Sequence, residues 1–222
     1  MNPLSRVLVL AGLVVPGTLV AQLPGIAHRN AGVTRGLQLA AEVGFSNAAQ
    51  IDGAAFGGTA AFGVGLIGFT ASVTTWQADW GVSPDDPARE YAVGVTGNYR
   101  LLGGPLVPLA VTVQAGVGRW TASAPSGSIM IEETTTSVPV GLGFALTIPS
   151  PIVSFKPWLA PRLQWTDRSE LGSTSDFALS GGIDFGFING TSIRGAYDRV
   201  FTDGQDRSVW SVGLAHSLGI GR

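Results

Sequence analysis

The chain has 222 residues, of which 45% are hydrophobic and only 13% are charged, and its formal net charge is −2. Soluble globular proteins carry roughly 25% charged residues, so this composition disfavours a soluble domain. The small negative charge provides no basic surface, and nucleic acid is therefore not expected as a partner. The absence of cysteine excludes a disulfide framework, a thiolate metal site and a lipid-anchored N-terminal cysteine.

The first 21 residues have the pattern of an export signal. Arg6 precedes an apolar stretch of nine residues at 7–15, and Pro16 ends it before a cleavage site predicted after Ala21. An N-terminal membrane anchor is the alternative, but this stretch is too short to span a bilayer. Residues 22–35 lack periodicity and are predicted to form a periplasmic lead-in to a barrel at residues 36–222.

The rest of the chain alternates between apolar and small or polar residues. Its mean hydropathy is +0.32, yet no later run of about 18 apolar residues could form a spanning helix. Side chains on a strand point alternately to opposite faces, so alternation separates a lipid face from an inner face. Ten such segments are predicted, at residues 36–46, 57–65, 68–77, 89–101, 107–121, 136–148, 154–166, 175–187, 191–201 and 208–220.

The connections between these segments fall into two classes. Long or polar connections lie near 47–56, 78–88, 122–135, 167–174 and 202–207, and short ones near 66–67, 102–106, 149–153 and 188–190. This alternation predicts an all-β protein, a closed antiparallel up-and-down transmembrane β-barrel. Ten strands are expected, and eight remain the alternative. The termini are expected in the periplasm and the long loops outside the cell.

Outward-facing aromatic residues cluster near the strand ends. Tyr91 and Tyr99 lie eight residues apart on one face, which corresponds to about 20 Å along the membrane normal for a tilted strand. A general preference of aromatic residues for strands is the alternative explanation. The predicted girdles at the two membrane boundaries comprise Phe45, Tyr91, Trp165, Phe201 and Trp210 on the outer side, and Tyr99, Phe155 and Phe187 on the inner side.

Charged residues within the segments mostly face inward. The outward basic residues Arg119, Arg199 and His216 are predicted near strand ends, where a charge in lipid costs least. We interpret the inward charges as a network of ion pairs that satisfies buried polar groups, and a solute path or proton relay is the alternative. The predicted lumen network comprises Glu42, Arg100, Lys156, Arg162, Asp184, Arg194 and Asp198.

The turn near residue 189 sets a register that can be predicted. A two-residue turn at Asn189 and Gly190 would place Phe185 opposite Arg194 and mix the two faces. A three-residue turn at 188–190, with Gly190 at positive φ, places Asp184 opposite Arg194 instead. We expect the second register, because the first would put a charge into lipid.

Trp76 and Trp120 interrupt the alternation by pointing inward near the outer rim. They could contact a ligand or plug the mouth of the barrel. A β-bulge that turns both rings outward into the girdle is the favoured prediction.

Signals for catalysis are weak. The only histidines are His28 and His216, and no Ser/His/Asp set, metal cluster or phosphate loop is visible in the sequence. No enzyme and no cofactor is therefore expected.

The leader ending at Ala21, the strand from Tyr91 to Tyr99 and the last strand from Trp210 to Ile220 resemble the small outer-membrane β-barrel proteins of Gram-negative bacteria, the OmpA-like and opacity-type group. The resemblance covers residues 36–220. Family members commonly end on an aromatic residue, whereas this chain ends on Arg222. The resemblance implies outer-membrane lipid and the barrel-assembly machinery as partners, and it identifies no external ligand. It implies a structural or surface-interaction role without catalysis, and the alternative is a narrow channel for small solutes or ions.

Overall fold

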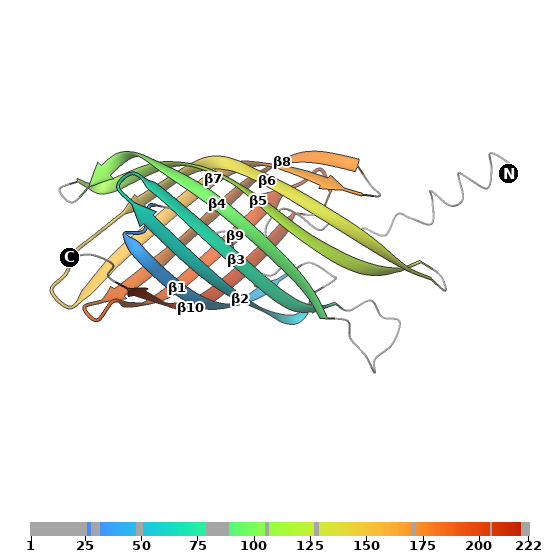
Figure 1. The fold of residues 1–222 in the computed structure, drawn as a ribbon, viewed down its shortest axis with the longest axis horizontal. Helices are drawn as coiled ribbons and strands as arrows, with labels where there is room; N and C mark the ends of the chain where they lie inside the picture. Colours follow the sequence, from blue (N-terminus) through green and yellow to red (C-terminus); the bar gives the residue numbers. More distant parts are fainter. Residues whose placement is uncertain are drawn as a thin grey trace, which may run out of the picture.

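The computed structural model describes residues 26–27, 32–47, 51–78, 89–104, 107–126, 129–169, 172–204 and 206–218, and the predicted leader lies outside them. The described residues form ten antiparallel strands in one closed barrel (Figure 1). Each strand pairs with its neighbours in the sequence, and β1 pairs with β10 to close the ring. The predicted ten-stranded up-and-down barrel is thus confirmed. No helix among the described residues is long and apolar enough to cross a membrane.

The strands have the following bounds: β1 (Gly36–Ser46), β2 (Ile51–Val64), β3 (Ile67–Ala78), β4 (Arg89–Gly104), β5 (Val107–Ser126), β6 (Ile129–Leu146), β7 (Val153–Arg168), β8 (Gly172–Phe187), β9 (Thr191–Phe201) and β10 (Arg207–Leu218). The connections at 65–66, 147–152 and 188–190 lie at one end of the barrel, hereafter the turn end. The opposite end is the loop end. β1 begins and β10 finishes at the turn end, where Leu37 is opposite Leu218.

Several strands are longer at the loop end than the sequence predicts. β2 begins at Ile51 instead of residue 57, and most of the predicted loop at 122–135 is a continuation of the β5–β6 hairpin. A hydroxyl hydrogen bond of 3.2 Å joins Thr121 to Thr134 across this hairpin. Cross-strand threonine pairs stabilise antiparallel strands, so a polar composition did not end the strands here.

The register follows the predicted face pattern. Asp184 is opposite Arg194, and Gly190 has a φ of 82°, which confirms the three-residue turn at 188–190. We can start at Glu42 and step from each residue to its partner on the next strand. This path reaches β7 at Arg168 in one direction round the barrel and at Lys156 in the other. This offset is the shear of the barrel, and it accounts for the strong tilt of the strands (Figure 1).

Prolines interrupt the ladders without changing the register. Pairing of β6 with β7 stops after Gly141 and Arg162 and resumes at Phe144 and Leu159 with the same register. The gap includes Pro161, which has no N–H to donate. β7 still pairs with β8 along its whole length, so the prolines that weakened its prediction are accommodated.

The outer surface of the barrel is apolar. The exposed side chains include Val95, Val140, Leu163 and Leu214, from strands around the ring. Soluble monomers rarely expose apolar patches of more than a few hundred Å², and a surface of this kind suits hydrocarbon. The inner surface consists of small and polar residues, among them the buried Ala92, Thr112, Ser137, Gln164, Ala178 and Ser211.

The aromatic residues predicted as girdles all lie on the outer surface. Tyr91 and Trp210 are among the most exposed, whereas Phe155 is partly covered by an edge-to-face contact with Phe185 at 5.2 Å between ring centroids. Of the outward basic residues, Arg199 and His216 lie near strand ends. Arg119 does not lie near a strand end, because β5 continues to Ser126. It is opposite Val93, which is two residues from the girdle residue Tyr91 on the same face of β4.

Candidate functional site in the barrel lumen

A fully buried ion pair between Arg162 and Asp198 lies on the inner wall. The Arg162 guanidinium donates hydrogen bonds of 3.0 and 2.9 Å to the two carboxylate oxygens of Asp198. It also donates to the hydroxyl of Ser180 and, at 3.2 Å, to the amide oxygen of Gln164. Both charged side chains have 0% relative exposure. Each of the three guanidinium nitrogens therefore has at least one acceptor, and these hydrogen bonds offset part of the desolvation cost of the pair.

The pair bridges an intervening strand. Arg162 is on β7 and Asp198 on β9, and β8 between them contributes only Ala178 and Ser180 to the wall below the guanidinium. These small residues leave the space that the long arginine side chain crosses. Gly141, on the other side of Arg162, serves the same purpose, because a Cβ there would lie 2.6 Å from the Cβ of Arg162.

A second group of charges centres on Arg194. Its guanidinium lies 3.5 Å from Asp184 on the neighbouring strand and 3.7 Å from Glu42, two strands away. Gly213 on β10 stands between Arg194 and Glu42. A Cβ at Gly213 would lie 2.7 Å from the Cγ of Glu42, so glycine leaves room for this ion pair.

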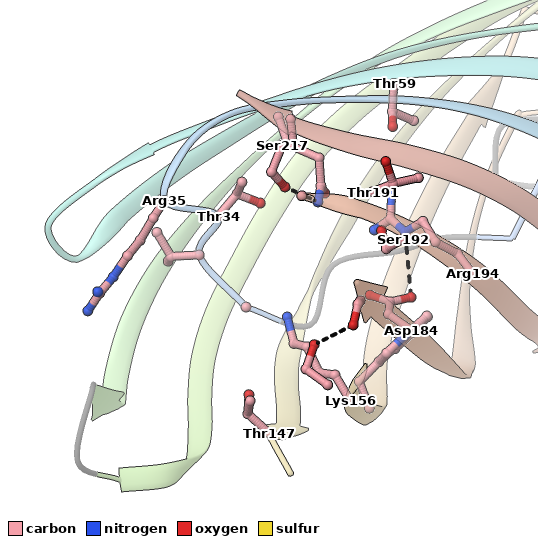
Figure 2. A pocket seen from close by; sticks show the side chains of 18 of the residues that line it. Thr34, Arg35, Thr59, Thr147, Lys156, Asp184, Thr191, Ser192, Arg194 and Ser217 are labelled. Atoms are coloured by element: carbon pink, nitrogen blue, oxygen red, sulfur yellow. Dashed lines mark hydrogen bonds and ion pairs between the residues drawn. The ribbon is translucent and has the colours of Figure 1, made fainter. Parts of the chain in front are cut away.

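A cavity of about 570 Å³ adjoins this second group near the turn end (Figure 2). Lys156 lies on its wall and is opposite Asp184 in the β7–β8 register. Gln38 donates a hydrogen bond of 3.0 Å to Ser217 across the β1–β10 seam. The other polar lining groups are mostly hydroxyls, from Thr34, Thr59, Thr70, Thr147, Ser154, Thr191 and Ser192.

The seven residues predicted as one lumen network therefore occupy three places. Arg162 and Asp198 form one pair, and Glu42, Asp184 and Arg194 form a second group with Lys156 beside it. Arg100 is separate, because its guanidinium donates to the backbone carbonyl of Gly65 in the β2–β3 turn. Arg100 thus fixes a turn at the rim instead of joining the charges of the interior.

Trp76 and Trp120 point into the lumen, and the prediction that a bulge turns them outward is wrong. Each is 2% exposed, and they pack in one cluster with Ile51, Ala55, Ala92 and Ala122. The β3–β4 and β4–β5 ladders are regular here, with Trp76 opposite Glu90 and Ala92 opposite Trp120. The β2–β3 ladder does shift its register between Asp52 and Phe56, beside Trp76, but the shift leaves the ring inside the barrel, where the small residue Ala92 makes room for both tryptophans.

Part of the predicted lead-in lies inside the barrel instead of outside it. Ile26 and Ala27 are 7% and 3% exposed. Ala27 packs with Ala145, Trp158, Ala160 and Ala196, and Gly32 to Arg35 line the cavity near the turn end. We call the described residues 26–27 and 32–35 the strap. The chain leaves the strap and enters β1 at Gly36, which has a φ of 72°.

Sequence reasoning missed the strap because its residues have no periodicity. One signal was present on β2, where the inward residues that follow Ile51 are small: Ala55, Gly57, Thr59, Ala61 and Gly63. A wall without side-chain bulk leaves space in the lumen, and that space has to be filled by another segment or by water.

Comparisons with known proteins agree with this architecture. No protein-family model matches the sequence, and no curated protein matches it. The β domain of the Bordetella autotransporter BrkA has a similar structure, with a TM-score of 0.55 and 15% identity over 83% of this chain and 100% of that one. The fold is that of an outer-membrane β-barrel. Identity this low shows the fold alone.

Two further solved outer-membrane β-barrels match with lower scores. The N-terminal β-barrel domain of Pseudomonas aeruginosa OprF has a TM-score of 0.44 and 11% identity, over 81% of this chain and 95% of that one. The outer-membrane protease OmpT of Escherichia coli has a TM-score of 0.44 and 12% identity, over 83% of this chain and 94% of that one.

At the loop end of the barrel, an exposed ion pair joins Arg199 to Asp206. Hydrogen bonds from the Arg199 guanidinium, together with one from the Thr202 amide, hold the pKa of Asp206 below its usual range. The pair therefore contributes stability above the unfolded pKa of about 3.9, and this contribution is lost as pH falls through the lower folded pKa.

We expect the carboxyl NMR signal of Asp206 to titrate below the unfolded pKa of about 3.9. Arg199→Gln should move the midpoint back up, and an unchanged midpoint would contradict this account.

Proposed function

We propose that this protein is an outer-membrane β-barrel of a Gram-negative bacterium with a structural or surface-interaction role, a closed lumen and no catalytic activity. In this proposal the turn end faces the periplasm and the loop end faces outward. Outer-membrane lipid and the barrel-assembly machinery would be its partners, in keeping with the apolar outer surface.

The burial of large inward-facing side chains is the observation that supports a closed lumen. Trp76, Trp120, Arg162, Gln114 and Gln164 are long or bulky side chains that face the interior, and each is fully buried. A continuous water-filled channel would leave such side chains wetted. Barrels of eight strands are filled by side chains and those of sixteen or more enclose a channel, so a filled ten-stranded barrel resembles the smaller class.

The charges of the lumen also support a structural role. Arg162, Arg194 and their three carboxylate partners bind one another, which is the usual way to keep charge in an interior. Catalysis has no comparable support. His216 is exposed and lies beside the Thr191 hydroxyl, at the end opposite the long loops.

The β5–β6 hairpin supports a role at the surface. β5 has 20 residues and β6 has 18, whereas β1 and β9 have 11 each. At roughly 3.3 Å per residue, the longer pair exceeds what a tilted strand needs to cross an apolar band of about 25 Å. The hairpin projects beyond the other strands at the loop end (Figure 1), where it presents a surface for contact with another molecule.

Conductance in planar bilayers tests the closed lumen. We expect the purified mature chain, reconstituted in potassium chloride, to show no steady unitary currents. Heat-modifiable migration on a gel would verify that the reconstituted protein is folded. Steady currents from folded protein would favour the narrow channel, for which the cavity of about 570 Å³ near Arg194 is the best supporting feature.

Location and orientation are tested separately. We expect the protein in the outer-membrane fraction. Because the chain has no cysteine, Glu132→Cys at an exposed position of the β5–β6 hairpin and Leu66→Cys in the β2–β3 turn each introduce a single thiol. A membrane-impermeant maleimide should label the first in intact cells and the second only after permeabilisation. The opposite pattern would reverse the orientation, and a folded protein that is soluble without detergent would refute the membrane assignment.

A further inference from the structure

We propose that the strap is a plug that closes the lumen, and that the barrel without it conducts small ions. This inference rests on the closed lumen of the proposed function and assigns the closure to one segment. It predicts a conducting form of the barrel that exists only when the strap is absent.

Two consecutive strap residues contact opposite walls of the barrel. The side chain of Ile26 lies against β2, because a Cβ at Gly57 would be 3.0 Å from its Cγ1. Ala27 packs against Trp158 and Ala160 of β7. In the closed ring, β2 and β7 are five strands apart in either direction and are therefore diametrically opposite. The lumen at this level has no more width than two residues of the strap occupy.

The strap crosses the lumen a second time nearer the turn end. A Cβ at Gly32 would lie 3.2 Å from the Nζ of Lys156 on β7. On the opposite wall, a Cβ at Gly63 of β2 would overlap the carbonyl oxygen of Thr34. Contacts with β7 and β2 at two levels mean that the described residues of the strap occupy the lumen at both levels and do not merely touch its rim.

The charged groups of the lumen lie along the wall instead of across it. Arg162 reaches from β7 to Asp198 on β9, and Arg194 reaches from β9 to Glu42 on β1. Each of these pairs spans only one intervening strand. The strap, by contrast, contacts the opposite walls β2 and β7. Its removal should therefore open a path, while the ion pairs remain as part of the lining.

The lining exposed by removal of the strap suits small hydrophilic ions. On the β1–β3 side it consists of Gly57, Thr59, Ala61, Gly63 and Thr70, and on the other side Lys156 and Arg194 are balanced by Asp184 and Glu42. A lining with hydroxyls and nearly balanced charge discriminates weakly between cations and anions. Potassium and chloride ions are the probes that fit a ten-stranded lumen.

Deletion of residues 24–33 is the first test, because it removes most of the strap and retains the leader and its predicted cleavage site. In planar bilayers with potassium chloride we expect the deletion variant to show steady unitary currents, at least about tenfold above the background current recorded with the silent full chain. A folded deletion variant that stays silent would overturn the plug while leaving the closed-lumen function intact. Steady currents from the full chain would overturn both.

Two adjacent glycines provide a matched pair of variants that keeps the strap sequence intact. A Cβ at Gly57 would lie 3.0 Å from Ile26 of the strap and 3.1 Å from the methyl carbon of Thr74 on β3, whereas a Cβ at Gly58 faces outward with only ordinary contacts of 3.8 and 3.9 Å. We expect Gly57→Val to displace the strap and produce currents, and Gly58→Val to remain silent. Equal behaviour of the two variants would contradict the proposal even if the deletion variant did not fold.

A cross-link tests the position of the strap directly. In a chain without cysteine, the double variant Ile26→Cys, Gly57→Cys should form a disulfide in the membrane fraction, since the two side chains meet in the lumen. The pair Ile26→Cys, Gly58→Cys should not. Failure of the first pair to form a disulfide in folded protein would show that the strap does not lie against β2.

Discussion

Replacement of Asp198 by asparagine is expected to lower the free energy of unfolding of the barrel by about 3–5 kcal/mol. The substitution leaves the Arg162 guanidinium without its carboxylate partner at a site where both side chains have 0% relative exposure. An uncompensated charge in an interior is far more costly than the pair itself. The measurement is the urea midpoint of the protein in detergent micelles, followed by heat-modifiable migration.

The matched control is Asp206→Asn, which removes the exposed partner of Arg199 at the loop end. The Arg199 and Asp206 side chains are 46% and 33% exposed, and exposed ion pairs contribute little, so the midpoint should hardly move. The double variant Arg162→Met, Asp198→Leu removes both charges and should recover most of the loss. If the single variant at Asp198 were as stable as the control, burial of the charge would not be the dominant effect.

The second large effect is expected from Gly182→Ala. A Cβ at Gly182 would lie 2.6 and 2.8 Å from two carbons of the Trp158 ring and 2.5 Å from the backbone oxygen of Gly195. Neither the packed ring nor the backbone can yield cheaply, so overpacking should cost about 1–3 kcal/mol. The result would be measured by the same denaturation in detergent micelles.

Gly195→Ala is the control for this substitution, because Gly195 faces outward on the neighbouring strand. The only atom near a Cβ there is the Cγ2 of Ile183 at 4.0 Å. This variant should be as stable as the original chain or slightly more so, since alanine restricts the unfolded state more than glycine does. Equal destabilisation by both variants would mean that loss of glycine in the strands, and not contact with Trp158, determines the outcome.

The strands and their faces could be predicted because membrane insertion penalises every error in alternation. A one-residue slip at the turn 188–190 would put Arg194 into lipid, and for this reason the register of Asp184 with Arg194 could be predicted from sequence alone. The extension of β5 and β6 at the loop end could not be predicted from sequence. There the strands leave the apolar band, and polar Ser, Thr and Glu residues no longer distinguish a loop from a solvated hairpin.

The contents of the lumen could be predicted only in part. Alternation shows that Arg162 and Asp198 face inward, but their pairing across β8 depends on small side chains at Ala178 and Ser180 between them. The inward position of Trp76 and Trp120 depends on the space left by Ala92 in the same way. Ile26 and Ala27 have no local pattern at all, because their burial comes entirely from contacts with distant strands.

The pairing of β1 with β10 has a consequence for assembly. This seam joins the first and the last strand, so the cylinder cannot close until the final hairpin has arrived. Pairing of such distant segments is slow, since chain entropy is lost before any contact compensates for it. The strap is attached directly to β1. Before the β1–β10 ladder forms, the open sheet can fold around the strap. Formation of this last ladder would then enclose the strap in the lumen.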